Sequence, residues 1–350
     1  MRGILLAAGK GTRMVPLTHR RPKPLVPVCD RPIIEHILLG ARDAGIDEVC
    51  LVVGYKGGML QERLGDGSGL GMRIEYVWQE VAGGTGAATL LAESFAGDEP
   101  FFLGWGDILV APRNYAAIVA AFGDPGAQAV LGANVVDDPW EGAAVYVTDG
   151  FVEKIIEKPA RGTSTTSYNN AGLFIFQPDL FDRLRQCTPS ARGEIEVPDA
   201  IQAMLADGVR IRGVEIEGYW SDVARPRDAI RMSAQVMDER QRPSPVFIDP
   251  SARISDEAAL KPPVYVGPDA VIEGGVIGPN VSVLRGAVIG AETRVYSALL
   301  LEGARIGEKA TVHHAFVEKG GTVPAGAHVA GTSQASAVVV GEGEVLTSQA

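Results

Sequence analysis

The chain has 350 residues, of which 46% are hydrophobic and 21% charged. This composition is typical of a globular protein with room for two domains, and it excludes a fibre or a largely disordered chain. Its 32 basic and 43 acidic side chains give a net charge of −11, so we expect no nucleic-acid partner. No stretch approaches the ~18 consecutive apolar residues of a membrane span, and the first residues do not form a signal segment. We therefore expect a cytoplasmic protein without a membrane partner.

Three cysteines, Cys29, Cys50 and Cys187, are too few and too scattered for a disulfide framework, and none has a zinc-ligand spacing. We expect them to be buried free thiols.

Short apolar runs alternate with helix-like segments from the amino terminus to residue 240, a pattern that predicts a layered α/β domain. The predicted strands, in chain order, are Gly3 to Ala7, Glu48 to Gly54, Arg73 to Trp78, Pro100 to Leu103, Ala129 to Val135, Gly172 to Phe176 and Arg210 to Val214. The predicted helices are Pro32 to Ala44, Gly86 to Phe95, Asn114 to Phe122, Val197 to Leu205 and Asp228 to Arg240.

The helical pattern stops at Pro243 and Pro245, because proline cannot continue a helix. Beyond them aliphatic residues return about every six positions, a period that fits neither a helix nor a half-buried strand but does fit a β-solenoid. The repeating residues are Val266, Ile272, Ile277, Val283, Ile289, Val295, Ile306, Val312, Val323 and Val329. We expect a first domain over residues 1–240, a linker over 241–262, a solenoid of roughly four coils over 263–332, and a flexible tail over 333–350.

A predicted strand ending in Leu6 and Ala7 runs into a glycine loop that holds Lys10 and Arg13. Backbone N–H groups of such a loop can contact phosphate oxygens while Arg13 supplies a forked donor. The loop lacks the spacing of a Walker A motif or a dinucleotide fingerprint. Further on, Lys23 stands between Pro22 and Pro24, which fix the backbone around it.

Together these two segments resemble the signature of the sugar-1-phosphate nucleotidylyltransferases, and the resemblance continues in order along residues 1 to 230. The further similar blocks are Gln79 with Gly83-Gly84-Thr85-Gly86, Gly106-Asp107, Glu141-Gly142, the stretch from Phe151 to Pro159, Asn170-Ala171-Gly172 and Gly218-Tyr219-Trp220-Ser221-Asp222. The resemblance implies a Rossmann-like three-layer α/β nucleotidyltransferase domain, here followed by a short left-handed parallel β-helix of hexapeptide repeats.

The resemblance also implies roles for individual residues. Nucleotide contacts are expected from Leu6, Ala8, Gly9, Gly11, Thr12, Arg13, Lys23, Gln79, Gly84, Thr85 and Asp107. Sugar-phosphate contacts are expected from Gly142, Glu157, Lys158, Asn170 and Trp220. Asp107 and Asp222 are the expected metal ligands, and Arg13, Lys23, Asp107, Lys158 and Asp222 the expected catalytic residues.

The implied reaction joins a nucleoside triphosphate to a sugar 1-phosphate and releases pyrophosphate. Repulsion between the two anions is the main obstacle, so Mg²⁺ on two carboxylates and several cations are needed to offset it. Arg13 would neutralise the leaving pyrophosphate, Lys23 the α-phosphoryl group and Lys158 the sugar phosphate.

Substrate choice depends on a few positions. Gln79 can donate to and accept from the edge of a uracil or thymine base, which favours UTP or dTTP with glucose 1-phosphate. A mannose-1-phosphate guanylyltransferase is the alternative enzyme, and a nucleotide-sugar-binding regulatory subunit is the alternative without catalysis. A non-sugar alcohol phosphate as acceptor fits the Glu157 and Asn170 blocks less well. Arg192-Gly193-Glu194 resembles a block of glucose-1-phosphate thymidylyltransferases.

Three further features concern the pocket and the assembly. Trp105 and Ala224 depart from the family pattern, and Trp105 could crowd the pocket. Acetyl transfer by the repeat domain, with His313 and His314 as candidates, is a less favoured possibility. A homo-oligomer assembled through the β-helix is expected.

Overall fold

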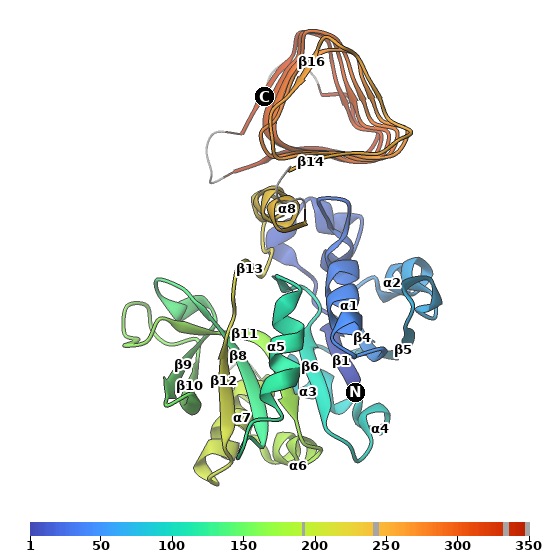
Figure 1. Ribbon diagram of the computed structural model, residues 1–350. Coiled ribbons are helices and arrows are strands. Elements are labelled where there is room, and N and C mark those ends of the chain that lie inside the picture. Colours follow the sequence, from blue (N-terminus) through green and yellow to red (C-terminus); the bar gives the residue numbers. More distant parts are fainter. Residues whose placement is uncertain (191–192, 241–244, 332–335, 347–350) are drawn as a thin grey trace. The chain divides into compact units, whose positions relative to one another are not determined.

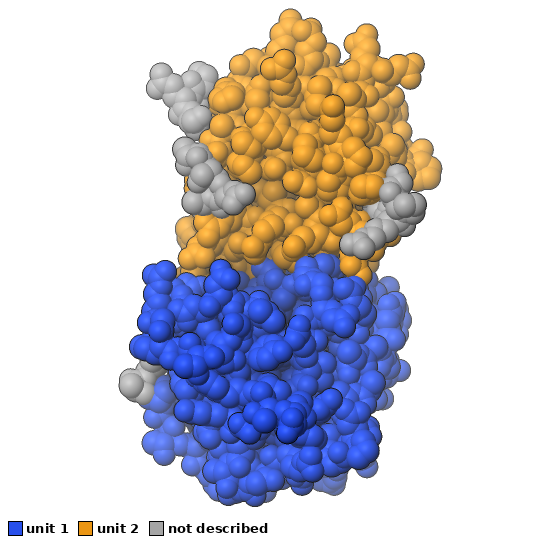
Figure 2. Space-filling model, turned by 60° about the vertical axis from the view of Figure 1, so that its left-hand side comes forward, with its two compact units in different colours: residues 1–10, 21–25, 33–222 blue, residues 11–20, 26–32, 223–350 orange. Residues whose placement is uncertain are grey.

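The computed structural model describes residues 1–190, 193–240, 245–331 and 336–346. The chain forms two compact units (Figure 2). Unit 1 contains residues 1–10, 21–25 and 33–222, and unit 2 contains residues 11–20, 26–32 and 223–350. In the described part of the chain, no helix is long and apolar enough to cross a membrane.

A nine-stranded mixed sheet forms the centre of unit 1 (Figure 1). Its strands, in spatial order, are β5 (Arg73–Trp78), β4 (Glu48–Val53), β1 (Arg2–Ala7), β6 (Phe101–Trp105), β11 (Tyr168–Phe176), β8 (Ala129–Val135), β12 (Ile211–Glu215), β10 (Phe151–Glu157) and β9 (Ala143–Thr148). The first four are parallel, whereas β11 runs antiparallel to both of its neighbours. All seven predicted strands are present in this sheet, with ends shifted by a few residues.

Helices cover both faces of the sheet. Ile4 of β1 packs in one core cluster with residues of α3 (Gly84–Leu90), α4 (Glu93–Ala96), α6 (Asp179–Gln186) and α7 (Val197–Ala206). The next residue, Leu5, is equally buried but outside that cluster, because successive strand residues point to opposite faces. On that other side α1 (Ile33–Asp43) packs against α5 (Arg113–Ala121), which contacts β8, β11 and β12. These layers confirm the predicted three-layer α/β fold.

Several elements of unit 1 were not predicted. The β9–β10 hairpin turns at Asp149 and Gly150, whose φ angles of 51° and 79° suit the tight turn that an Asp-Gly pair favours. This dipeptide was the signal in the sequence that could have revealed the hairpin. Helix α6 and helix α2 (Gly57–Leu64) were also missed, and the helix predicted over Gly86 to Phe95 is divided into α3 and α4.

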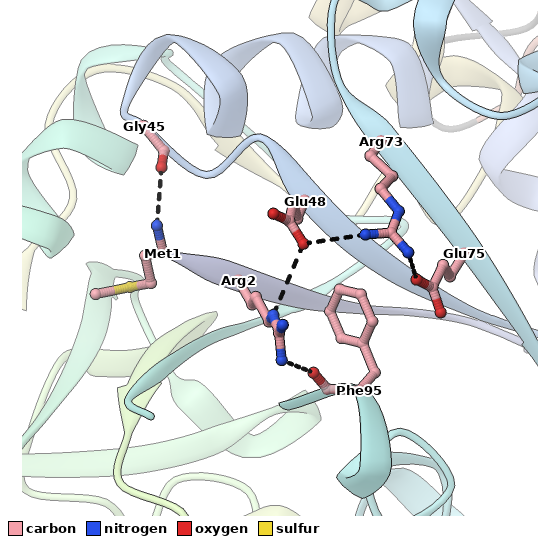
Figure 3. A network of polar contacts seen from close by, with 7 residues as sticks. All are labelled: Met1, Arg2, Gly45, Glu48, Arg73, Glu75 and Phe95. Carbon is pink, nitrogen blue, oxygen red and sulfur yellow. Dashed lines mark hydrogen bonds and ion pairs between the residues drawn. The ribbon is translucent and has the colours of Figure 1, made fainter. Parts of the chain in front are cut away.

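The amino ends of β1, β4 and β5 carry a network of charged side chains (Figure 3). Glu48 lies 3.7 Å from Arg2 and 3.6 Å from Arg73, and Arg73 also pairs with Glu75. Arg2 donates to the carbonyl oxygen of Phe95 at 2.8 Å. All four charged side chains are at least 41% exposed, so water screens their attraction.

Unit 2 contains a parallel β-helix with triangular coils (Figure 1). Its strands are β14 (Val246–Ile248), β15 (Arg253–Ile254), β16 (Ala258–Leu260), β17 (Val264–Val266), β18 (Val271–Ile272), β19 (Gly275–Ile277), β20 (Val281–Val283), β21 (Val288–Ile289), β22 (Arg294–Leu300), β23 (Arg305–Ile306), β24 (Thr311–Val317), β25 (Thr322–Val323), β26 (His328–Ala330) and β27 (Val338–Val340). Equivalent residues of adjacent coils are mostly 17 or 18 positions apart, as in Val264 paired with Val281 and Val246 with Val264. All ten aliphatic residues of the sequence repeat are at most 2% exposed, which confirms the predicted solenoid.

The limits of the β-helix differ from those expected. Strands β14 to β16 occupy 246–260, inside the predicted linker, and pair with the next coil. They were missed because this first coil carries fewer buried aliphatic residues. The predicted tail likewise holds β27, which pairs with β24. The predicted stop at Pro243 lies outside the described residues.

Helix α8 (Pro226–Arg240), assigned from the sequence to the first domain, belongs to unit 2. It packs against β17, β20, β22 and β24 of the β-helix, and its residues Met232 and Val236 are fully buried. The sequence did not reveal this packing, because the helical period shows an apolar face but not the surface that covers this face.

The cysteines are free thiols, as expected, and Cys29 and Cys50 are buried. Burial raises the pKa of each of these two thiols to about 12. Cys187 is only half-buried, because it follows α6 at the edge of the core cluster.

Candidate active site

The carboxyl ends of the four parallel strands bring several predicted residues to one edge of the unit 1 sheet. Ala8 and Gly9 follow β1, Gln79 follows β5 and Asp107 follows β6. Backbone hydrogen bonds tie these loops together, from Gly106 N–H to the oxygen of Leu6 at 2.8 Å and from Gln79 N–H to that of Val53 at 2.7 Å. Loops at this edge are the usual binding region of an open α/β sheet.

A partly buried ion pair lies at this edge. Lys23 Nζ is 2.8 Å from Asp107 Oδ2, and the side chain of Lys23 is only 7% exposed. A short 3-10 turn from Lys23 to Leu25 places the lysine, and Pro24 within it restricts the backbone. The side chain of Asp107 is 39% exposed, so it can also reach a ligand from solvent.

The second predicted carboxylate follows a short strand beside Asp107. Strand β13 (Trp220–Ser221) pairs antiparallel with β7 (Leu109–Val110), and Ser221 stands opposite Leu109. Asp222 directly follows β13, and Asp107 stands two positions before β7. The structure thus brings two carboxylates 115 positions apart in the sequence to one end of one ladder. In the described residues, no cluster of three or more His, Cys, Asp or Glu side chains could hold a metal ion.

The residue after Asp222 has an unusual backbone conformation. Val223 has a φ of 37° and is fully buried. A β-branched residue is strained in this region, and such strain concentrates at functional sites where the surrounding structure holds it.

The glycine segment before α3 is held by a second stretch of chain. Thr85 Oγ1 donates to Glu196 Oε2 at 2.8 Å and accepts a hydrogen bond from Val197 N–H at 3.0 Å. A Cβ on Gly84 would lie 2.4 Å from the carbonyl oxygen of Ile195. Glycine is therefore required where the two stretches meet. The sequence did not identify Glu196, which is 6% exposed and stands two positions after the Arg-Gly-Glu block.

Buried asparagines organise the predicted sugar side. Asn169, missed from the sequence, donates to Asn134 Oδ1 at 3.0 Å and accepts from Ala143 N–H at 3.2 Å. A Cβ on Gly142 would lie 2.1 Å from Asn169 Oδ1, so the amide fits there only against glycine. The predicted residue Asn170 accepts from Gly172 N–H at 2.9 Å. The repeated asparagine at 169 and 170 was the available signal.

The remaining predicted sugar-side residues also belong to unit 1. Lys158 has a φ of 43°, donates its N–H to the oxygen of Gly142 at 2.8 Å, and lies with its ammonium group 3.6 Å from Glu157. Its side chain is 49% exposed. Trp220 donates from its ring nitrogen to the oxygen of Ala171 at 3.1 Å.

Trp105, which could have crowded the pocket, packs within unit 1. Its ring lies 5.1 Å from that of Phe174, and a Cβ on Gly172 would lie 2.6 Å from Trp105 Cδ1. The glycine at 172 therefore makes room for the indole.

The predicted nucleotide loop is divided between the two units at Gly11. Leu6, Ala8 and Gly9 belong to unit 1, whereas Gly11, Thr12 and Arg13 belong to unit 2. Gly11 has a φ of 60° and accepts a hydrogen bond from Thr18 Oγ1 at 3.1 Å. The nucleotide contacts expected from all of these residues stay predictions, and Arg192 lies outside the described residues.

Comparison with known proteins gives consistent matches. A family model described as nucleotidyl transferase matches residues 2–239. The low-salt glycan biosynthesis nucleotidyltransferase Agl11 of Haloferax volcanii is 36% identical over 69% of this chain and 67% of its own length. A glucose-1-phosphate thymidylyltransferase of Streptomyces griseus is 30% identical over 99% of this chain and 94% of its own length. The bifunctional protein GlmU of Methanococcus maripaludis is 32% identical, and the chain matches 55% of that protein.

Solved structures show the same similarity. A Bacillus anthracis protein assigned as a glucose-1-phosphate thymidylyltransferase, in complex with a sucrose, aligns with a TM-score of 0.62 at 27% identity, over 70% of this chain and 97% of that one. A UDP-glucose pyrophosphorylase complexed with UDP-glucose aligns with a TM-score of 0.61 at 22% identity, over 68% of this chain and 99% of that one; this second likeness concerns the fold alone.

Proposed function

Because this chain belongs to the nucleotidyl transferase family, we propose that it transfers a nucleotidyl group from UTP or dTTP to glucose 1-phosphate and releases pyrophosphate. The observation that carries the proposal is the arrangement of Lys23, Asp107 and Asp222 at one edge of the unit 1 sheet. A buried cation beside two carboxylates suits a reaction in which two phosphate-bearing anions must approach each other.

The two carboxylates fit a magnesium ion. They are hard oxygen donors, and Mg²⁺ in phosphate sites is commonly bound by one or two carboxylates together with waters and substrate oxygens. With only two such ligands from the described chain, the triphosphate would supply the others. When bound, Mg²⁺ would lower the repulsion between the two substrates and align them for in-line displacement.

The protein's own groups would bind and orient the substrates. Lys23, held at 2.8 Å from Asp107, is placed to neutralise the α-phosphoryl group as the sugar phosphate oxygen attacks. Lys158 is half exposed and can turn toward the phosphate of the sugar, while Glu157 accepts hydrogen bonds from sugar hydroxyls. A covalent intermediate is not required, because the sugar phosphate oxygen is itself the nucleophile.

The choice of base rests on Gln79. The backbone N–H of Gln79 donates to the carbonyl oxygen of Val53. This hydrogen bond fixes the position on the sheet edge from which the side-chain amide extends. An amide both donates and accepts, which suits a pyrimidine edge. Relatives named glucose-1-phosphate thymidylyltransferase support dTTP and glucose 1-phosphate as the first pair to test.

Pyrophosphate release from the purified full chain tests the proposal. The chain is incubated with Mg²⁺, each of four nucleoside triphosphates and either glucose 1-phosphate or mannose 1-phosphate. We expect turnover with dTTP or UTP and glucose 1-phosphate. Asp107→Ala should abolish this turnover without changing the thermal unfolding curve. Turnover only with GTP and mannose 1-phosphate would assign the guanylyltransferase activity instead. Nucleotide binding without turnover for any pair would make the protein a nucleotide-sugar-binding regulatory subunit.

A further inference from the structure

Unit 2 contains a cavity of about 690 Å³ where helix α8 lies along one corner of the β-helix. Its size is within the range of ~300–1,000 Å³ that small-molecule sites occupy. All of its lining residues belong to α8 and the β-helix. The cavity is therefore a feature of unit 2 alone, separate from the carboxylates of unit 1.

Three coils contribute one side chain each from the same corner. Asn280, Ser297 and His314 follow one another at 17-residue intervals and line the cavity. Their φ angles are 61°, 48° and 48°, a region that favours glycine and strains other residues. The corresponding residue of the next coil is Gly331, as the pairing of His313 with Ala330 indicates. Polar side chains at one corner of three successive coils thus line the cavity.

The ring of His314 is held by its neighbours. His313 packs against His314 with ring centroids 3.8 Å apart, and against Tyr296 of the preceding coil at 4.0 Å. This tilted ring contact orients the imidazole at the cavity, and the ring makes no hydrogen bond with the described residues. Its nitrogens can then donate to or accept from a ligand.

Helix α8 adds two guanidinium groups. Arg227 and Arg231 are four residues apart and so lie on one face of the helix. Asp228 lies 3.8 Å from Arg227 and 3.7 Å from Arg231, and it accepts the N–H of Arg225 at 2.8 Å. The charged side chains that line the cavity are therefore two arginines and one acid, in a chain whose net charge is −11.

We propose that this cavity binds the phosphate group of a small phosphorylated metabolite. Arg227 and Arg231 supply forked donors that match phosphate oxygens, and His314 and Asn280 supply further donors from the opposite wall. Ile230 and Ala234 add apolar lining for the remainder of the ligand. The site is distinct from the proposed catalytic edge and does not depend on turnover.

Histidine signals of the full chain provide the test, because the chain has only five histidines. The protein is labelled at the histidine rings and titrated with inorganic phosphate, and separately with glucose 6-phosphate, at constant ionic strength. We expect a saturable shift of the His314 signal, which His314→Gln identifies by its absence. Tighter binding of glucose 6-phosphate than of inorganic phosphate would identify a phosphate ester as the ligand, and the reverse order free phosphate.

Matched variants decide whether the cavity is responsible. Arg231→Gln removes a guanidinium at the cavity whose side chain is 63% exposed and should weaken binding at least about tenfold. Arg305→Gln removes the same charge from exposed β23, on another side of the coil, and should leave binding unchanged. Lys23→Met should also leave it unchanged, so that failure of the catalytic proposal is distinguishable. A His314 shift that does not saturate, or that is equal in Arg231→Gln, would overturn the inference.

Discussion

The charged side chains at the two ends of the parallel strands in unit 1 differ in their exposure to water. At the amino ends Arg2, Glu48, Arg73 and Glu75 pair in water (Figure 3). At the carboxyl ends Lys23 is almost completely buried against Asp107. Exposed ion pairs contribute little to the stability of the fold because water screens them. A buried cation, in contrast, interacts strongly with any charge that approaches it. Charged pairs are therefore exposed to water at one edge and partly buried at the other, where we propose that substrates bind.

Backbone support differs in the same way. At the carboxyl edge close approaches of glycine, such as Gly84 to Ile195 and Gly142 to Asn169, fix the loops. At the amino edge long side chains reach across neighbouring strands. Gly84 approaches a backbone carbonyl and Gly142 a side-chain amide, and neither position has room for a Cβ.

After the loss of turnover expected for Asp107→Ala, the largest effect is expected from Lys23→Met. Removing the buried ammonium group takes away one charge aimed at the transition state, and we expect kcat/KM to fall about 10²–10³-fold, or ~2.7–4 kcal/mol. Asp107 is partly exposed, so solvent can hydrate it and the unfolding temperature should change little. Steady-state pyrophosphate release and thermal unfolding measure both quantities. A near-normal rate in this variant would show that Lys23 takes no part in the reaction.

An intermediate effect is expected from Thr85→Val, which keeps the shape but removes the hydroxyl between Glu196 and Val197. The buried carboxylate of Glu196 then loses a partner, at a cost of about 1–3 kcal/mol. We expect a higher KM for the nucleotide and a smaller change in kcat, since the segment that positions the base loosens. Thr163→Val, which removes an exposed hydroxyl bond to Ala160, serves as control. Equal effects of the two changes would contradict a special role for Thr85.

The smallest effect is expected at the amino edge. Arg73→Gln breaks its exposed pairs with Glu48 and Glu75 and should cost about 0.2–1 kcal/mol of unfolding free energy. Turnover should stay within about twofold of the unchanged protein, since the network lies at the other end of the strands. Urea denaturation at low and high salt measures the loss, which should shrink as salt screens the charges. A large loss of activity would mean that the two edges are not functionally separate.

Periodicity determined most of the architecture. The six-residue aliphatic repeat predicted the β-helix, and its ten members are all buried, because only one direction of each coil side faces the interior. Apolar runs likewise predicted seven strands of the unit 1 sheet. The hairpin of β9 and β10 escaped although an Asp-Gly pair marks its turn, and the first coil escaped because its apolar residues are less buried.

The candidate site divides along similar lines. Lys23, Gln79 and Asp107 were identified as members of sequence blocks, whereas Asn169 and Glu196 were not, because their importance lies in what they touch. Glu196 holds Thr85 from 111 positions away. A hydrogen bond between such distant segments cannot be predicted from the sequence of either segment alone.

The amino-acid sequence by itself determined the family, the two kinds of fold and the residue types that can meet phosphate and metal. Only the tertiary structure decided that α8 packs on the β-helix, that Asp222 comes to the end of the ladder beside Asp107, and that a charged cavity forms along one coil corner. Local patterns record whether a residue is turned inward or outward, since burial recurs with the period of the element. Which surfaces then meet depends on contacts between distant segments, and these contacts form only when the chain folds.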